Sequence, residues 1–195
     1  SILDLKEIEL SWFDKWLKGI PDSFEQSSPV KIFMMGSNEW RNEESWPPKN
    51  ITNTPIYLHS NGNSNSASGD GLLSFEKPGK ETADSFTYNP MFPVPTKGGG
   101  NCCDPHIVNW GAFDQREVEA RADILVYTSK TLTSEMEISG PIILKLFAST
   151  DCRDTDFTAK LVDVFPDGKA INLCDGIIRG RYRDSTKQQS LLNPG

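Results

Sequence analysis

The feature that most constrains the fold is a repeated alternation that begins after Pro21. Short runs of β-branched and aromatic residues are separated by clusters of Gly, Pro, Asn and Asp, and the chain contains 15 Gly and 13 Pro. Such interrupted runs are typical of an all-β fold, because each cluster supplies a turn between strands. Their number favours two sheets packed face to face, so we expect a β-sandwich. The predicted strands are residues 30–35, 55–59, 85–88, 123–128, 136–138, 142–148, 157–165, 170–173 and 177–182.

The segment before Pro21 has a helical periodicity instead. Between Asp4 and Lys18 apolar residues recur every three or four positions, which places them on one face of a helix. Asp4 followed by Glu7 resembles a capping box, and Gly19 is a typical stop signal. We expect one amphipathic helix here, packed by its aromatic face on a substantial neighbour. The apolar residues of that face are Leu5, Ile8, Trp12, Phe13, Trp16 and Leu17.

Two segments between the predicted strands are informative. A Pro- and Gly-rich stretch from Pro90 to Trp110 has little strand character, and loops of that length in compact domains usually carry function or contacts. We therefore expect interactions there. Farther along, Pro166-Asp167-Gly168 predicts a tight turn that joins two strands as a hairpin.

Charge and hydropathy exclude two classes of partner. The chain has 20 Lys and Arg against 27 Asp and Glu, a net charge of -7, and its basic residues are scattered. Nucleic-acid binding needs basic side chains gathered along the phosphates, so we expect no nucleic-acid partner. The apolar runs fall far short of the roughly 20 residues that cross a bilayer, so we expect a soluble chain with no membrane partner. Charged residues near the N-terminus also argue against a secretory signal, which favours the cytoplasm unless an export signal lies outside this fragment.

The sequence holds no complete set of acyl-transfer residues. A nucleophilic Ser on a Gly-x-Ser-x-Gly elbow is absent. The two histidines, His59 and His106, have no nucleophile motif near them. We therefore interpret both as ordinary strand or loop histidines, and we predict that the fragment alone is inactive.

The cysteines leave alternatives open. Four are too few for a disulfide scaffold, so they are either reduced or include a single bridge between Cys152 and Cys174. Cys102, Cys103 and His106 suggest a zinc site, but adjacent cysteines rarely both ligate a tetrahedral ion, and a second Cys pair is missing. A thiol enzyme that uses Cys102 or Cys103 lacks a placed base. We expect neither a metal nor another cofactor.

Three carboxylates near the C-terminal strands raise the question of calcium. Asp151, Asp154 and Asp156 are close in sequence, but the Gly and bidentate Glu of a calcium-binding EF-hand loop are missing. Roles in turns and caps fit these residues better.

A series of short motifs extends over nearly the whole chain in a fixed order. They are FDKWLKG at 13–19, MG at 35–36, EWR at 39–41, WP at 46–47, GDGLLS at 69–74, YNP at 88–90, PVP at 93–95, DQR at 114–116, DILVY at 123–127 and DTDFTAKLVDV at 154–164. Together they resemble the C-terminal region of the CocE/NonD-type serine hydrolases, the family of the esterases, α-amino-acid ester hydrolases, glutaryl acylases and X-Pro dipeptidyl-peptidases.

The resemblance implies a fold and a domain arrangement. The expected fold is a jelly-roll, galactose-binding-like β-sandwich that follows an α/β-hydrolase domain carrying the Ser, Asp and His triad. Residues 1–21 would then be the last helix of that missing domain, and 22–195 would be the sandwich. The family continues into further strands, so the resemblance implies a sandwich truncated at its end, with open edges.

The same resemblance implies a non-catalytic role. None of the triad residues carries over to this chain, so no catalytic residue is expected. The domain would pack on the hydrolase domain and help wall its active-site cleft. The loop after Pro95 would lie near the acyl pocket, with Gly100, Asn101, Cys102 and Cys103 as wall residues.

Other readings remain open. A free-standing jelly-roll module that binds glycans or proteins is the alternative, supported by Trp40, Trp46 and Trp110 in loop-like surroundings. A Gly-x-Ser-x-Gly motif upstream in the encoding gene would favour the hydrolase. The parent's substrate stays open between an ester, a β-lactam amide and a dipeptide. The apolar helix face and open edges also predict that the isolated fragment self-associates as a homo-oligomer.

Overall fold

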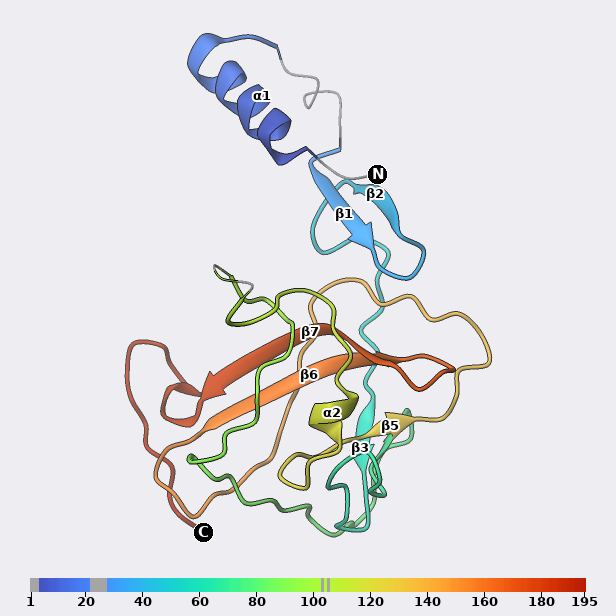
Figure 1. Cartoon of the computed structure of the whole chain (residues 1–195), viewed down its shortest axis with the longest axis vertical. Coiled ribbons are helices and arrows are strands. Elements are labelled where there is room, and N and C mark those ends of the chain that lie inside the picture. The colour runs from blue at the N-terminus through green and yellow to red at the C-terminus, as the bar shows by residue number, and fades with distance from the viewer. Residues whose placement is uncertain (1–3, 22–27, 103, 105) are drawn as a thin grey trace. The chain divides into compact units, whose positions relative to one another are not determined.

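The computed structural model describes residues 4–21, 28–102, 104 and 106–195. The chain forms two compact units, which we describe separately: Ser1–Thr54 with Met136–Ile143, and Pro55–Glu135 with Leu144–Gly195 (Figure 1). Each unit therefore combines segments that are distant in sequence. The sequence predicts a domain boundary between residues 21 and 22, with residues 1–21 belonging to a hydrolase domain. The division into compact units rests on contacts within this chain and does not test that boundary, which stays a prediction.

The N-terminal helix forms as expected. It is α1, Leu5–Lys18, and the Asp4 Oδ1 atom accepts hydrogen bonds from the backbone N–H groups of Lys6 at 3.0 Å and Glu7 at 3.3 Å. Gly19 ends the helix at φ 69°, a left-handed conformation that suits glycine. None of its residues is buried. The predicted apolar face is therefore exposed, most of all at Leu5, Trp12, Phe13, Trp16 and Leu17.

The first unit also contains a hairpin. Strand β1, Val30–Met34, pairs antiparallel with β2, Glu39–Glu43. The sequence predicted β1 but not β2, whose polar composition hides its strand character. Trp40 fixes the pairing, because its ring lies opposite Phe33 with 5.2 Å between the ring centroids. Arg41 forms two hydrogen bonds to Glu137, of 2.6 and 2.9 Å, and so ties the 136–143 segment to the hairpin.

The second unit holds two sheets. Strand β3, Tyr57–His59, pairs antiparallel with β4, Leu72–Ser74, and β4 pairs parallel with β5, Thr128–Ser129. The longer strands β6, Asp156–Val164, and β7, Ala170–Arg179, form an antiparallel hairpin with an irregularity between Leu161 and Val162 (Figure 1). Gly168 in the turn has φ 83°, so the predicted Pro-Asp-Gly hairpin is confirmed.

Two short helices and a small core complete the second unit. Helix α2, Arg116–Glu119, was not predicted, because a single turn leaves no periodicity to detect; η2, Gly180–Tyr182, follows β7 directly. Among the described residues, the buried apolar side chains are Val118 and Ala170. The buried polar side chains are Ser64, Gln115 and Asn172. Polar contacts therefore form an unusually large part of this interior.

Three predicted strands do not form, and a fourth, 123–128, overlaps β5 only at Thr128 and otherwise contributes an isolated bridge at Leu125. Residues 85–88, 136–138 and 142–148 form no strand, although they are rich in apolar and β-branched side chains. A strand needs a hydrogen-bonding neighbour, and these described segments have none. In the last segment apolar side chains on both sides are exposed, including Ile143 at 76% and Phe147 at 104%. The two strands predicted at 170–173 and 177–182 are joined as β7, which ends at Arg179; residues 180–182 form η2 instead of a strand.

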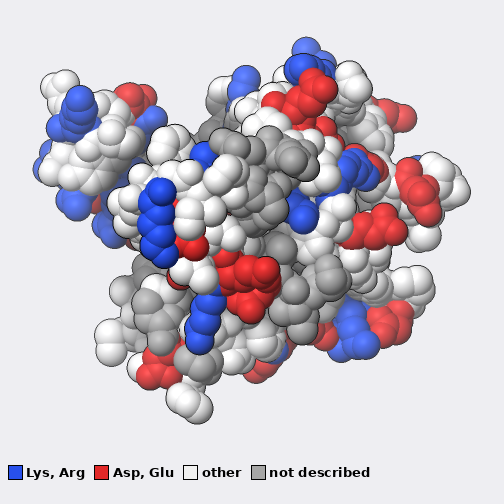
Figure 2. Space-filling view, turned by 90° about the horizontal axis from the view of Figure 1, so that it is seen from above, with Lys and Arg blue, Asp and Glu red and all other residues white. Residues whose placement is uncertain are grey.

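The surface mixes charges of both signs. On the face that Figure 2 shows, Lys and Arg side chains are interspersed with Asp and Glu. This face therefore offers no broad basic patch. Within the described part of the chain, no helix is both long enough and apolar enough to span a membrane.

Candidate functional site

His59, the last residue of β3, has part of the geometry of a catalytic base. Its Nδ1 atom lies 2.7 Å from Glu81 Oε1, as a carboxylate would orient a triad imidazole. Its Nε2 atom, however, lies 2.9 Å from the backbone oxygen of Glu76, which can only accept a hydrogen bond. The hydrogen bond to Glu81 raises the pKa of His59, because both partners of the ring are acceptors and favour its protonated form. The ring therefore has no free nitrogen to take a proton from a serine.

His106 and the nearby hydroxyl groups do not replace it. His106 is exposed, and its backbone N–H donates to Asp104 Oδ1 at 2.9 Å. Ser60 and Tyr127 both donate their hydroxyl hydrogens to Asp84, at 2.6 and 2.7 Å. These contacts bind three segments of the second unit together. Both hydroxyl hydrogens point to the Asp84 carboxylate, so neither hydroxyl is placed to give its proton to a histidine base.

Burial and hydrogen bonds together set the pKa values of Asp84 and Tyr127 in this cluster. Burial opposes ionisation of Asp84, but the hydrogen bonds from Ser60 and Tyr127 outweigh it and lower the pKa of Asp84. Burial, together with the Asp84 carboxylate, raises the pKa of Tyr127 to about 12. A phenol held neutral beside a carboxylate is a structural hydrogen-bond donor rather than a nucleophile.

The C-terminal carboxylates bind arginines. Asp154 accepts the backbone N–H of Arg181 at 3.0 Å and pairs with Arg179 at 3.4 Å, while Asp156 pairs with Arg179 at 2.5 Å. The sequence favoured turn and cap roles over calcium; it did not predict the pairing with arginine that the structure shows. Among the described residues, no group of three or more His, Cys, Asp or Glu side chains is placed to hold a metal ion.

The structure shows the state of three cysteines. Cys152 and Cys174 are both free thiols, so the alternative of a bridge between them is wrong. The neighbouring Asp151 raises the pKa of the Cys152 thiol, which disfavours the reactive thiolate. Cys102, which is exposed on the 90–110 loop, is disulfide-bonded, so the alternative that all four cysteines are reduced is wrong as well. Cys103 lies outside the described residues.

The predicted wall residues follow a tight chain crossing. Gly99 and Gly111 exchange two backbone hydrogen bonds, of 2.7 and 2.9 Å, and so close the base of the 99–111 loop. Asn101 Nδ2 donates to the backbone oxygen of Gly98 at 2.6 Å. Gly100 and Cys102 are exposed and Asn101 is half-buried. Their place in a substrate pocket stays a prediction.

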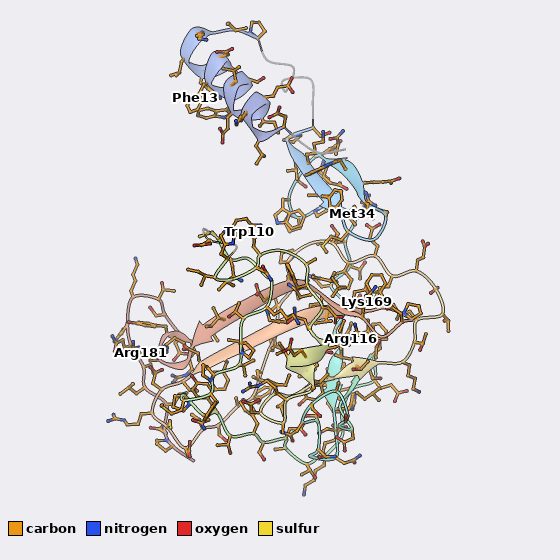
Figure 3. All side chains as sticks on the ribbon, in the orientation of Figure 1. Phe13, Met34, Trp110, Arg116, Lys169 and Arg181 are labelled. Atoms are coloured by element: carbon orange, nitrogen blue, oxygen red, sulfur yellow. The ribbon has the colours of Figure 1, made fainter. Side chains whose placement is uncertain are left out.

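Two buried amides under the loop were missed by sequence reasoning. Gln115 and Asn172 are joined by a 3.1 Å hydrogen bond from Gln115 Nε2 to Asn172 Oδ1. Gln115 is 1% exposed and Asn172 3%. Gln115 stands in the DQR motif, the one signal that pointed to it, whereas Asn172 lies in a strand of ordinary appearance. In Figure 3 Arg116 lies at the start of α2, and Trp110 lies on the loop.

The three tryptophans that suggested a binding module lie in different surroundings. Trp40 stacks on Phe33, whereas Trp46 and Trp110 are about half exposed and belong to different units. A cleft of about 470 Å³ lies in the first unit, and its lining of mostly charged and polar residues includes Arg41, Glu137 and Ile51 but no tryptophan. This lining lacks the aromatic surface on which a sugar ring would stack.

Comparisons with known proteins show the family of this chain. Residues 22–195 match the model of the X-Pro dipeptidyl-peptidase C-terminal non-catalytic domain. This chain belongs to that family. The non-catalytic role of the domain agrees with the doubly hydrogen-bonded His59 and with the missing nucleophile motif.

Individual relatives are longer proteins. The cocaine esterase of Rhodococcus sp. is 43% identical over 95% of this domain chain and 32% of its own length. A protein of Mycobacterium bovis described as a serine esterase is 26% identical over 89% of the chain and 26% of its own length. The chain thus spans about a third or less of the relatives it matches.

Solved structures agree on the fold. An aminopeptidase from a marine-sediment Thaumarchaeota archaeon matches with a TM-score of 0.71 and 27% identity, over 97% of this chain and 31% of its own. An α-amino acid ester hydrolase matches with the same score and identity, over 95% and 31%. The predicted jelly-roll sandwich with an N-terminal helix, and the predicted family, are confirmed.

Proposed function

We propose that this domain packs on the α/β-hydrolase domain of a serine ester hydrolase and walls one side of its active-site cleft. The observation that carries the proposal is the 43% identity to a cocaine esterase over nearly the whole chain but only 32% of the relative. The remaining length of such a relative has room for the catalytic machinery that this domain lacks.

The exposed apolar surface supports a protein partner. The face of α1 presents Trp12, Phe13 and Trp16 to solvent, at 54%, 50% and 64% exposure. Burying large apolar side chains contributes about 1.5–3 kcal/mol each, so a partner that covers this face would bind firmly. A terminal helix of the hydrolase domain would be covered in this way.

Relatives favour the substrate class. Two of the relatives named above are described as esterases, and the α-amino acid ester hydrolase adds a third ester-cleaving protein. Carboxylic esters are therefore our proposed substrates, ahead of X-Pro peptides and β-lactam amides. The wall of the acyl pocket would include Gly100, Asn101, Cys102 and Cys103.

The first test concerns catalysis by the domain alone. The purified chain is assayed with p-nitrophenyl acetate and an X-Pro p-nitroanilide, and is treated with a fluorophosphonate that labels activated serines. We expect neither turnover nor labelling, since His59 has no free ring nitrogen. The Rhodococcus esterase serves as positive control. Stoichiometric labelling of a serine in this chain would overturn the non-catalytic assignment.

The second test concerns the partner. In a chimera, this chain replaces the matching third of the Rhodococcus cocaine esterase. We expect the chimera to hydrolyse p-nitrophenyl acetate, and we expect the esterase truncated before this region to lose most of its activity. A chimera that folds but does not contact the hydrolase domain, as judged by cross-linking, would contradict the proposal.

A further inference from the structure

We propose that Gln115 and Asn172 are positioning residues that set the course of the 99–111 loop and, through it, the acyl-group selectivity of the hydrolase. The inference rests on the proposed function for its link to substrate. The link to the loop rests on the geometry of this chain alone.

The amide pair binds both legs of the loop at once. Gln115 Nε2 donates to the backbone oxygen of Lys97 at 2.8 Å on the incoming leg and to that of Phe113 at 3.0 Å on the outgoing leg. Asn172 Oδ1 accepts the backbone N–H of Phe113 at 2.7 Å, and its Nδ2 donates to the backbone oxygen of Gly111 at 3.3 Å. Strand β7, which carries Asn172, thereby fixes the separation of the two legs.

Close packing leaves the legs no freedom to shift. A Cβ atom on Gly98 would lie 2.5 Å from the oxygen of Gly111 and 3.1 Å from Asn172 Oδ1. A Cβ atom on Gly99 would lie 2.3 Å from a carboxylate oxygen of Asp175 on β7. Both glycines also have positive φ, 68° and 94°, so the incoming leg reaches the amides only with glycine at these positions.

The polar character of this contact points to positioning rather than to stability. Gln115 Oε1 is buried without a hydrogen-bond partner, which is unfavourable compared with an apolar side chain of the same volume. Directional hydrogen bonds, unlike apolar packing, hold a backbone in one register. The pair therefore sets where the chain leaves Gly100 and re-enters at Asn109, and so where a wall residue can lie.

The experiment measures the loop and the selectivity separately. Gln115→Leu is compared with Ser64→Ala, a matched change at another fully buried polar residue of the same unit. In Gln115→Leu we expect hydrogen exchange at the Gly99 and Gly111 amides to accelerate roughly 10- to 100-fold, since their hydrogen bonds lose support. In Ser64→Ala we expect exchange at these two amides to stay within about twofold.

Selectivity is measured in the chimera described above. The ratio of kcat/KM for p-nitrophenyl benzoate to that for p-nitrophenyl acetate should change about tenfold in Gln115→Leu, mainly through the KM of the benzoate, and not in Ser64→Ala. Gln115→Met, which keeps the length of the side chain, loses the donor and adds no charge, gives the same direction of change and stands in if Gln115→Leu fails to fold.

Two outcomes separate the two proposals. The positioning role is overturned if hydrogen exchange at the Gly99 and Gly111 amides is unchanged in both Gln115 variants. It is also overturned if these variants leave the kcat/KM ratio unchanged although replacing residues 101–109 by a Gly-Ser linker changes that ratio. In either case the proposal that the loop walls the acyl pocket stands. If the Gly-Ser linker leaves the kcat/KM ratio unchanged, the proposal that the loop walls the acyl pocket is overturned. The inference about selectivity then fails as well, whatever the exchange data show.

Discussion

Polar side chains inside the second unit serve to place backbone segments rather than to react. Gln115 and Asn172 use amide groups that do not titrate, so their own hydrogen bonds to the loop do not depend on the protonation of either side chain. His59 uses an ionisable ring for a similar purpose, because it joins Glu81 to the backbone of Glu76. The stability of this contact therefore depends on protonation.

The pH dependence of His59 gives a residue-scale prediction. Its hydrogen bond to Glu81 raises its pKa in the folded chain, whereas in the unfolded chain the pKa is about 6.5. The contribution to stability is therefore complete below about pH 6.5 and is lost as the pH rises through the folded-state pKa. We expect the melting temperature to fall more steeply over that range in the wild type than in Glu81→Gln.

The exposed His106 provides the control, because its ring makes no described contact of this kind. His106→Gln should leave the slope of melting temperature against pH unchanged. An NMR titration that places the midpoint of the His59 ring at or below that of an unfolded peptide would contradict the prediction.

Among the elements, the β6–β7 hairpin has the longest pairing and depends on a tight turn. Gly168 has φ 83° with open space around its Cα, so only its backbone conformation demands glycine. Gly176, within β7, also has open space but no positive φ. The two glycines therefore form a matched pair that separates backbone strain from steric exclusion.

An alanine scan of this pair is the element-scale prediction. Gly168→Ala should lower the free energy of unfolding by about 1–2 kcal/mol, since a left-handed conformation disfavours a Cβ. Gly176→Ala should raise it by up to about 1 kcal/mol, because alanine restricts the unfolded chain. Urea titrations of both variants measure the difference. Equal effects would show that the turn tolerates another backbone conformation.

Prediction from sequence worked where the determining contacts are local. The Asp4 cap, the Gly19 stop and the Gly168 turn each depend on a few neighbouring residues, and all three were found. Strand β2 was missed because its stability comes from Trp40 packing across to Phe33. Residues 142–148 were wrongly assigned to a strand because their pattern is right but their pairing partner is missing from the described chain.

Prediction of the candidate site also worked for local features and failed for contacts between distant residues. The loop was located by its Pro and Gly content, and its wall residues came from the family resemblance. The clamp beneath it was not foreseen, because Gln115 and Asn172 meet only after the chain has folded across 57 positions. A single Gln in a short motif gives no sequence signal that its side chain is buried.

On the scale of the whole molecule, large apolar side chains are exposed on several segments. They include Trp16 and Leu17 on α1, and Ile143 and Phe147 in the 142–148 segment. Apolar surface of this extent belongs in contact with other protein.

Self-association is therefore the prediction at this scale. We expect the isolated chain to elute from size-exclusion columns above 21.7 kDa and to do so increasingly with concentration. The double change Trp16→Gln with Leu17→Gln should shift elution toward the monomer, because it removes apolar side chains that are 64% and 77% exposed. Glu9→Gln, a polar change on α1, is the control. A monomer at every concentration would refute the prediction.

The glycine crossing beneath the loop has a consequence for how such domains diverge. The backbone hydrogen bonds between Gly99 and Gly111 and the packing of Gly98 and Gly99 against β7 fix both ends of the loop. Within the loop, the side chain of Asn101 also binds the Gly98 oxygen. The residues after Asn101 can then be exchanged as a cassette, in length as well as in composition, while the sandwich stays untouched. Libraries built between Asn101 and Trp110 would thus vary the presented surface on a constant frame, which is the arrangement that engineering of new selectivity requires.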